Sequence, residues 1–187
     1  MKKTIIAVLV GTFIMFIYQA LSWMVLPTHK NSFKYTDKEG AILEAMSGLE
    51  EGTYMIPGKP PGRSDKDHME QMKSYIGKPW ATFNYHPSMV SNMPKSMAIG
   101  FILNFITIWI FVWLLKKMTN LTRGAIIMAA LAVGALFIFN SHLMNWNWMT
   151  IPMHHISGEI IDSIVSWLLV GLWIGWYWTR KAKTAAV

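Results

Sequence analysis

The chain has 187 residues, of which 53% are hydrophobic and 14% are charged. Soluble domains carry about 25% charged residues, so this composition favours a membrane protein. There is no cysteine, which excludes disulfides and any metal site built on cysteine. The formal net charge is +7, but the basic excess lies in small clusters beside apolar runs. That pattern indicates membrane orientation and argues against nucleic acid as a partner.

Four apolar runs predict four transmembrane helices. The first covers residues 4–26 and spans roughly 34 Å as a helix, enough to cross a hydrocarbon core of about 30 Å. The other three are expected at about 97–115, 124–144 and 156–178. The first run is long for the apolar part of a cleaved signal peptide, which is the alternative interpretation. We therefore expect an all-α membrane protein, with residues 1–26 as its first transmembrane segment.

The basic clusters predict the orientation of these helices. They lie before the first run, between the second and third, and after the fourth: Lys2, Lys3, Lys116, Lys117, Arg123, Arg180, Lys181 and Lys183. Four spans place all of them on one side, and the positive-inside rule makes that side the cytoplasm. We expect a multi-pass protein of a bacterial inner membrane with both termini in the cytoplasm. Its expected partners are the lipid bilayer and other membrane-protein subunits.

The segment between the first two runs, residues 27–96, is then an extracytoplasmic insertion with α+β structure. Thr36 and Glu39 form a capping-box pattern that predicts a helix ending at Gly52. Residues 53–56 and 80–85 have the composition of short strands, which we expect to pair. Ser64 predicts the N-cap of a second helix that runs to about residue 76. The remaining part of the chain, residues 97–187, carries the last three helices.

Methionine and histidine are concentrated on the predicted outer side, which raises the question of a metal site. The candidate ligands are His142, Met153, His154 and His155, with His29 as a further candidate. Imidazole and thioether ligands together suit copper, which is the one candidate cofactor. Against this, His154 and His155 would point about 100° apart on a helix, and histidine pairs at helical ligand spacing are absent from the sequence. Gap filling by methionine and polar-interface positions for histidine are the simpler explanation.

Glu159 and Asp162 are the only acidic residues outside the insertion. Their spacing places them on one face of the fourth helix. Acidic residues in spanning helices are costly and often functional. A position within two turns of the outer boundary, where water reaches, favours a structural role for both. The alternative is a proton or cation site shared with His155 or His142.

Small residues at four-residue spacing predict close helix packing. The pairs are Gly171 with Gly175 and Ala130 with Gly134. Trp167 and Trp173 lie deep in the fourth helix and are candidates for contact with lipid, a quinone or a partner helix.

Four motifs occur in order along the chain. The first three are SWMVLPTH at residues 22–29, TYMIP at 53–57 and NWNW at 145–148. The fourth is an aspartate and a tryptophan with four residues between them, Asp162 and Trp167. Together they resemble a group of small, uncharacterised bacterial inner-membrane proteins with four helices. The resemblance implies a four-helix layout with an outer domain after the first helix. It implies no catalytic residue.

Motifs of the common enzyme classes are absent from the sequence: it has no nucleophile elbow, P-loop, dinucleotide-binding fingerprint or HExxH. The favoured function is therefore a non-enzymatic accessory or structural subunit of a larger inner-membrane assembly, such as a respiratory or other redox complex. Two alternatives stay open. One is extracytoplasmic handling of copper or another metal, and the other is a membrane enzyme or ion carrier that uses Glu159 and Asp162.

Overall fold

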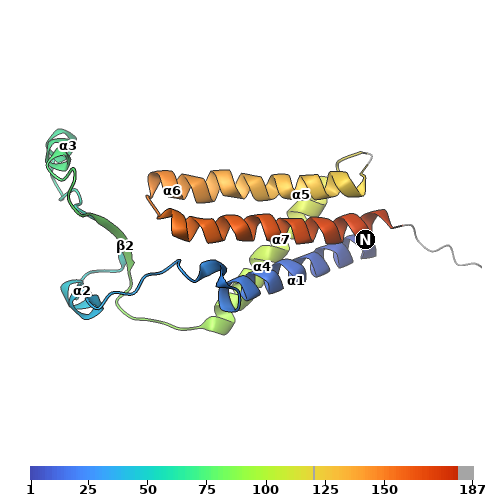
Figure 1. Cartoon of the computed structure of the whole chain (residues 1–187), viewed down its shortest axis with the longest axis horizontal. Helices are drawn as coiled ribbons and strands as arrows, with labels where there is room; N and C mark the ends of the chain where they lie inside the picture. Colours follow the sequence, from blue (N-terminus) through green and yellow to red (C-terminus); the bar gives the residue numbers. More distant parts are fainter. Residues whose placement is uncertain (120, 181–187) are drawn as a thin grey trace, which may run out of the picture. The chain divides into compact units, whose positions relative to one another are not determined.

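The computed structural model describes residues 1–119 and 121–180. It is mostly helical, with four long apolar helices and a small α+β segment between the first and second of them (Figure 1). By length and composition, four candidate spans cover Lys2–Met24, Met93–Leu115, Arg123–Trp148 and Met153–Thr179. The predicted fold class is thus confirmed, and the chain is a multi-pass membrane protein. Lys181 and Lys183 of the predicted basic clusters lie outside the described residues.

The first span is α1 (Lys2–Met24), and a 3-10 turn at Pro27–His29 follows it. The second is α4 (Met93–Leu115), which begins four residues before the apolar run because Asn92 caps it. The Asn92 side chain accepts a hydrogen bond of 3.2 Å from the Lys95 amide. A polar first turn therefore precedes the apolar part of this helix.

The third span is composite. It consists of α5 (Arg123–Phe137), a π-helical segment (Ile138–Leu143) and α6 (Met144–Trp148). It ends four residues beyond the predicted boundary. The fourth span, α7 (Met153–Thr179), begins directly after Pro152, three residues before the predicted start.

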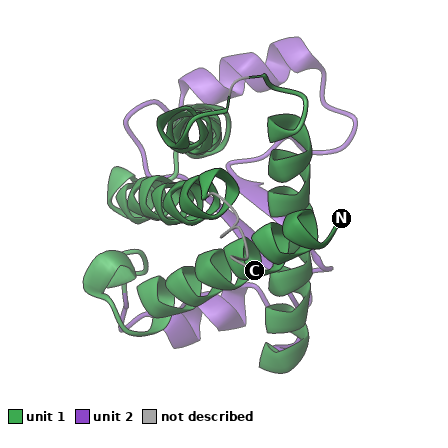
Figure 2. Cartoon of the chain, turned by 90° about the vertical axis from the view of Figure 1, so that its right-hand side faces the viewer, with its two compact units in different colours: residues 1–34, 92–187 green, residues 35–91 purple. Residues whose placement is uncertain are grey.

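The chain divides into two compact units, which Figure 2 colours separately. The first comprises residues 1–34 and the described residues from Asn92 onward, and contains the four spans. Within it α7 packs against both α5 and α1, and α1 also packs against α4. The second unit, Tyr35–Ser91, is the α+β segment.

The core of the first unit lies toward one end of the helices. The buried residues of α4 all fall in its C-terminal half, and the remaining core members come from α1, α5 and α7: Ile108, Phe111, Val112, Leu115, Val8, Met15, Ile126, Ala130, Trp167, Val170 and Ile174. The N-terminal half of α4 has no buried residue. Tight packing at one end and its absence at the other leave room for a cavity beside that half of α4.

The four small residues predicted to pack helices lie at the contact of α5 with α7. A Cβ at Gly171 would lie 2.8 Å from the Ala130 Cβ, and one at Gly134 would lie 3.0 Å from the Ser163 carbonyl oxygen. At Gly175 the distance to the Arg123 carbonyl oxygen would be 3.2 Å. These distances are too short for larger side chains. Lipid supplies no hydrophobic force between helices, so such close van der Waals contact is what holds this pair together.

The second unit contains α2 (Glu39–Ala45), β1 (Gly52–Ile56), α3 (Asp65–Lys73) and β2 (Ala81–Tyr85). The strands pair antiparallel, with Tyr54 opposite Phe83, and these two rings stack 5.5 Å apart. The unit buries no residue. It therefore has secondary structure without a core of its own.

Of the two helix N-caps predicted in this unit, the one at Ser64 is confirmed and the one at Thr36 is wrong. Ser64 caps α3 as predicted, accepting a hydrogen bond from the Asp67 amide. The predicted capping box of Thr36 is wrong, because α2 begins at Glu39 and Lys38 occupies its N-cap position. The Thr36 hydroxyl instead accepts a hydrogen bond from the Lys38 amide within a turn. The helix ends at Ala45, well before the predicted Gly52, and Gly48 follows with a φ of 84°.

Candidate functional site

Asp162 is buried in the membrane-spanning part of the chain. It is 7% exposed. It lies nine residues after the first residue of α7, which is about 14 Å along the helix axis. Because α7 starts three residues before the apolar run, Asp162 lies more than two turns from the start of the helix, and neighbouring side chains cover it. Glu159 is likewise beyond the first turn of α7, which contains no acidic residue.

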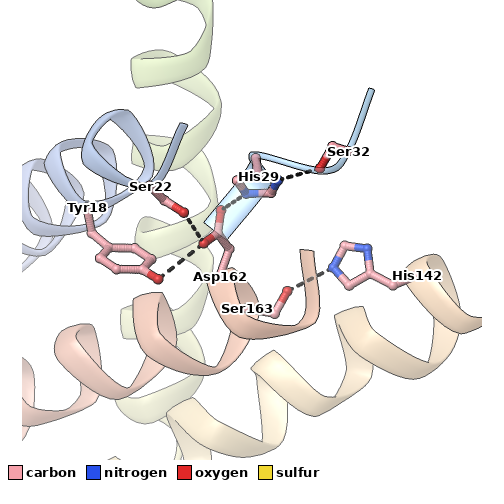
Figure 3. A network of polar contacts seen from close by, with 7 residues as sticks. All are labelled: Tyr18, Ser22, His29, Ser32, His142, Asp162 and Ser163. Carbon is pink, nitrogen blue, oxygen red and sulfur yellow. Dashed lines mark hydrogen bonds and ion pairs between the residues drawn. The ribbon is translucent and has the colours of Figure 1, made fainter. Parts of the chain in front are cut away.

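Three side chains surround the Asp162 carboxylate (Figure 3). Its Oδ1 accepts hydrogen bonds from the Tyr18 hydroxyl at 3.1 Å and from the Ser22 hydroxyl at 2.5 Å. Its Oδ2 lies 2.9 Å from His29 Nε2. His29 Nδ1 in turn lies 3.3 Å from the Ser32 hydroxyl. Each carboxylate oxygen thus has a donor, which offsets the large cost of placing a charge in a membrane.

Local sequence explains how these side chains meet. Tyr18 and Ser22 are four residues apart on α1 and so share one face of that helix. Pro27 is the first residue of the 3-10 turn that carries His29. The Trp23 ring stacks on the His29 ring, with centroids 3.8 Å apart and planes at 8°. The turn is thereby fixed over the end of α1.

Gly158 lets this turn approach α7. A Cβ at Gly158 would lie 2.8 Å from two atoms of the His29 ring and 3.1 Å from the Thr28 carbonyl oxygen. Any side chain at this position would push His29 away from α7, and with it from Asp162.

His142 takes part in a separate contact. It lies in the π-helical segment, and its Nε2 is 2.8 Å from the Ser163 hydroxyl of α7. Figure 3 shows this pair beside the Asp162 network. Short π-helical insertions are frequent at functional sites.

The predicted metal ligands are not gathered at one point. Met153 and His154 are exposed, and His155 Nδ1 lies 3.3 Å from the Ser32 carbonyl oxygen. Residues 1–119 and 121–180 contain no group of three or more His, Cys, Asp or Glu side chains placed to hold a metal. Copper binding by His142, Met153, His154 and His155 stays a prediction.

A cavity of about 580 Å³ adjoins the network. Its walls come from α1, the N-terminal half of α4, the third span and α7. Across it, the Asn104 amide of α4 donates a hydrogen bond of 2.7 Å to the Gln19 side chain of α1. Glu159 and Asp162 both line it.

The cavity wall includes one buried serine, Ser166, whose hydroxyl has no hydrogen-bond partner among the described residues. Ser166 is 2% exposed. A buried polar group without a partner costs about 1–3 kcal/mol. Ser166 is one of the residues that line the cavity, so a group bound there is a candidate partner for this hydroxyl.

Comparisons with protein-family models, with curated proteins and with solved structures give no match for this chain.

Sequence reasoning singled out several residues of the network and the cavity wall, but not the pairing of Asp162 with His29: Asp162, His29, His142, Glu159 and Trp167. Tyr18, Ser22, Gly158 and Ser166 were missed. The motifs carried a usable signal, because SWMVLPTH contributes Ser22, Trp23 and His29 and the last motif contributes Asp162. These two motifs, about 130 residues apart, meet in the structure.

Replacing His29 tests how much the His29–Asp162 pair contributes to the stability of the fold. We expect His29→Ala to lower the free energy of unfolding by about 3 kcal/mol, because a buried carboxylate loses its only nitrogen donor. Reversible unfolding in mixed micelles measures this. In an Asp162→Asn background the same change should cost far less, and His154→Ala, at an exposed histidine, should cost under about 0.5 kcal/mol. Equal costs of His29→Ala in both backgrounds would contradict the pairing.

Proposed function

We propose that the protein is a non-enzymatic membrane subunit that binds a lipid-soluble molecule in the cavity between its spans. The observation that carries this proposal is the buried, unpartnered Ser166 hydroxyl in the wall of a cavity of about 580 Å³. Ligand pockets of proteins usually measure about 300–1,000 Å³ and combine apolar walls with a few polar groups. This cavity has that character, with Met15, Phe16 and Trp167 among its apolar residues.

Binding is favoured over conversion of the molecule because Asp162 and His29, the acid–imidazole pair beside the cavity, are already engaged. Both oxygens of Asp162 accept hydrogen bonds from the chain itself, and His29 is held between Asp162 and Ser32. These residues support the wall. The alternative of an enzyme or ion carrier that uses Glu159 and Asp162 stays a prediction.

Filling the cavity should abolish binding. Gly100 lines it, and a Cβ there would meet no atom within 4 Å, so Gly100→Leu adds bulk to the cavity from a position with open space. We expect native mass spectrometry of the wild-type protein in mild detergent to show a bound lipid-soluble molecule, and the Gly100→Leu protein to lack it.

The matched control is Gly124→Leu, at a helical glycine that also has open space but lies outside the cavity wall. It should retain the molecule. Equal occupancy in both variants, or no bound molecule in the wild type, would refute the proposal.

A second role, as an accessory subunit of a larger assembly, is favoured by the α+β unit. Two-stranded sheets are marginal in water, and this unit buries none of its residues. It also carries an apolar groove of about 530 Å³, which includes Met55, Ile76 and Trp80. A second protein of the same membrane that covers this groove would supply the missing core.

Charge in the groove should break such an assembly. Ile76 and Val90 are 81% and 82% exposed in the same unit, but only Ile76 lines the groove. We expect the protein, purified in mild detergent at native expression, to migrate as an assembly larger than its 21.4 kDa chain. Ile76→Asp should release the chain and Val90→Asp should not. A wild-type monomer would exclude this role.

We further propose that both termini lie in the cytoplasm of a bacterium and the α+β unit outside it. The described basic residues support this orientation. Lys3 Nζ donates a 2.7 Å hydrogen bond to the Trp178 carbonyl oxygen, so the start of α1 and the end of α7 lie together. Arg123 packs beside Gly175, and Arg180 lies over the Tyr177 ring. One end of the four spans is therefore basic, as the positive-inside rule requires of a cytoplasmic face.

Reporter fusions test the orientation. Alkaline phosphatase, which is active only outside the cytoplasm, should be active when inserted in the loop around Lys59 and inactive when fused after Val187. A green fluorescent protein fused after Val187 should fluoresce. Phosphatase activity after Val187 would overturn the proposed orientation.

A further inference from the structure

The charges around the cavity restrict what it can hold. The described residues that line it include two carboxylates, Glu159 and Asp162, but no lysine or arginine. Glu159 is half-buried and makes no ion pair or hydrogen bond with another described side chain. Asp162 is paired with His29, but an anionic head group would meet the Glu159 carboxylate without a balancing cation, in a medium where charge repulsion is poorly screened.

The remaining polar groups of the wall are neutral hydrogen-bonding groups. The Ser166 hydroxyl has no partner, as described above. The hydrogen bond between Asn104 and Gln19 uses one amide group of each, which leaves the Gln19 amide nitrogen available as a donor. A head group that carries carbonyl oxygens would accept hydrogen bonds from both residues.

The apolar part of the wall is strongly aromatic. Phe16, Trp23, Phe137 and Trp167 all line the cavity. Aromatic side chains prefer offset-stacked or edge-to-face contact with another flat ring. A flat ring therefore fits these walls better than a branched, flexible head group does.

We infer that the cavity takes an uncharged molecule with a flat ring, carbonyl oxygens on that ring and a hydrocarbon tail, which is the chemistry of a membrane quinone. This inference rests on the proposed binding function and narrows it to one class of ligand. In this proposal Ser166 supplies a hydrogen bond to a ring oxygen, and the Glu159 carboxylate disfavours phosphate head groups.

The test is a calorimetric titration of the full-length protein in phosphatidylcholine nanodiscs with a decyl-substituted benzoquinone. Empty nanodiscs correct for partitioning of the probe into lipid. We expect saturable binding that Ser166→Ala weakens about three- to tenfold, as the loss of one hydrogen bond predicts. Ser157→Ala, an exposed serine on the same helix, should bind like the wild type.

A second experiment distinguishes failure of the quinone inference from failure of the proposed binding function. The protein is exposed to phosphatidylglycerol, and bound molecules are identified by native mass spectrometry in the wild type and in Gly100→Leu. Phosphatidylglycerol held by the wild type and lost in Gly100→Leu would keep the binding function and overturn the quinone chemistry. Failure of the benzoquinone to bind, or equal affinity in Ser166→Ala, would also overturn it. Absence of any molecule that depends on Gly100 would refute both.

Discussion

A carboxylate inside a membrane-spanning helix is stable only where hydrogen-bond donors surround it, and Asp162 imposes this requirement on the end of the bundle where α1 finishes and α7 begins. Its donors come from α1 and from the turn that follows α1. Their convergence fixes the end of α1, the His29 turn and α7 to one another. Gly158 is needed at the same point because only a residue without a side chain lets the turn come this close.

A second constraint is the weakness of helix association in lipid. Apolar side chains gain nothing there by leaving water, so spans adhere where their backbones approach closely. Gly171 against Ala130 and Gly175 against Arg123 give α5 and α7 this contact, and the core gives α4 a matching contact at its C-terminal half only. The N-terminal half of α4 contacts α1 through the Phe101 ring but buries no residue. The cavity is thus a consequence of where close packing stops, with the Asp162 network forming part of its wall.

The α+β unit lies outside the four spans and lacks the buried apolar core that stabilises a domain in water. Strand pairing, the Ser64 cap and the Tyr54–Phe83 stack organise it locally. Local organisation does not replace a core, because apolar burial is the main favourable contribution to folding in water. Under the proposed function, the cavity between the spans would bind a lipid-soluble molecule. The apolar groove of the α+β unit would bind a second protein.

The sequence by itself determined the four spans, the two strands and the small-residue helix faces, because apolar run length, alternation and residue size act locally. It also marked Asp162, His29 and His142 as residues of interest. Only the tertiary structure decided that Asp162 pairs with His29 rather than with His142 or His155, since that choice depends on how a turn at residue 27 packs on a helix 130 residues later. It likewise decided the cavity and the unpartnered Ser166, because an empty space between helices arises from their mutual angles and leaves no periodic trace in the chain.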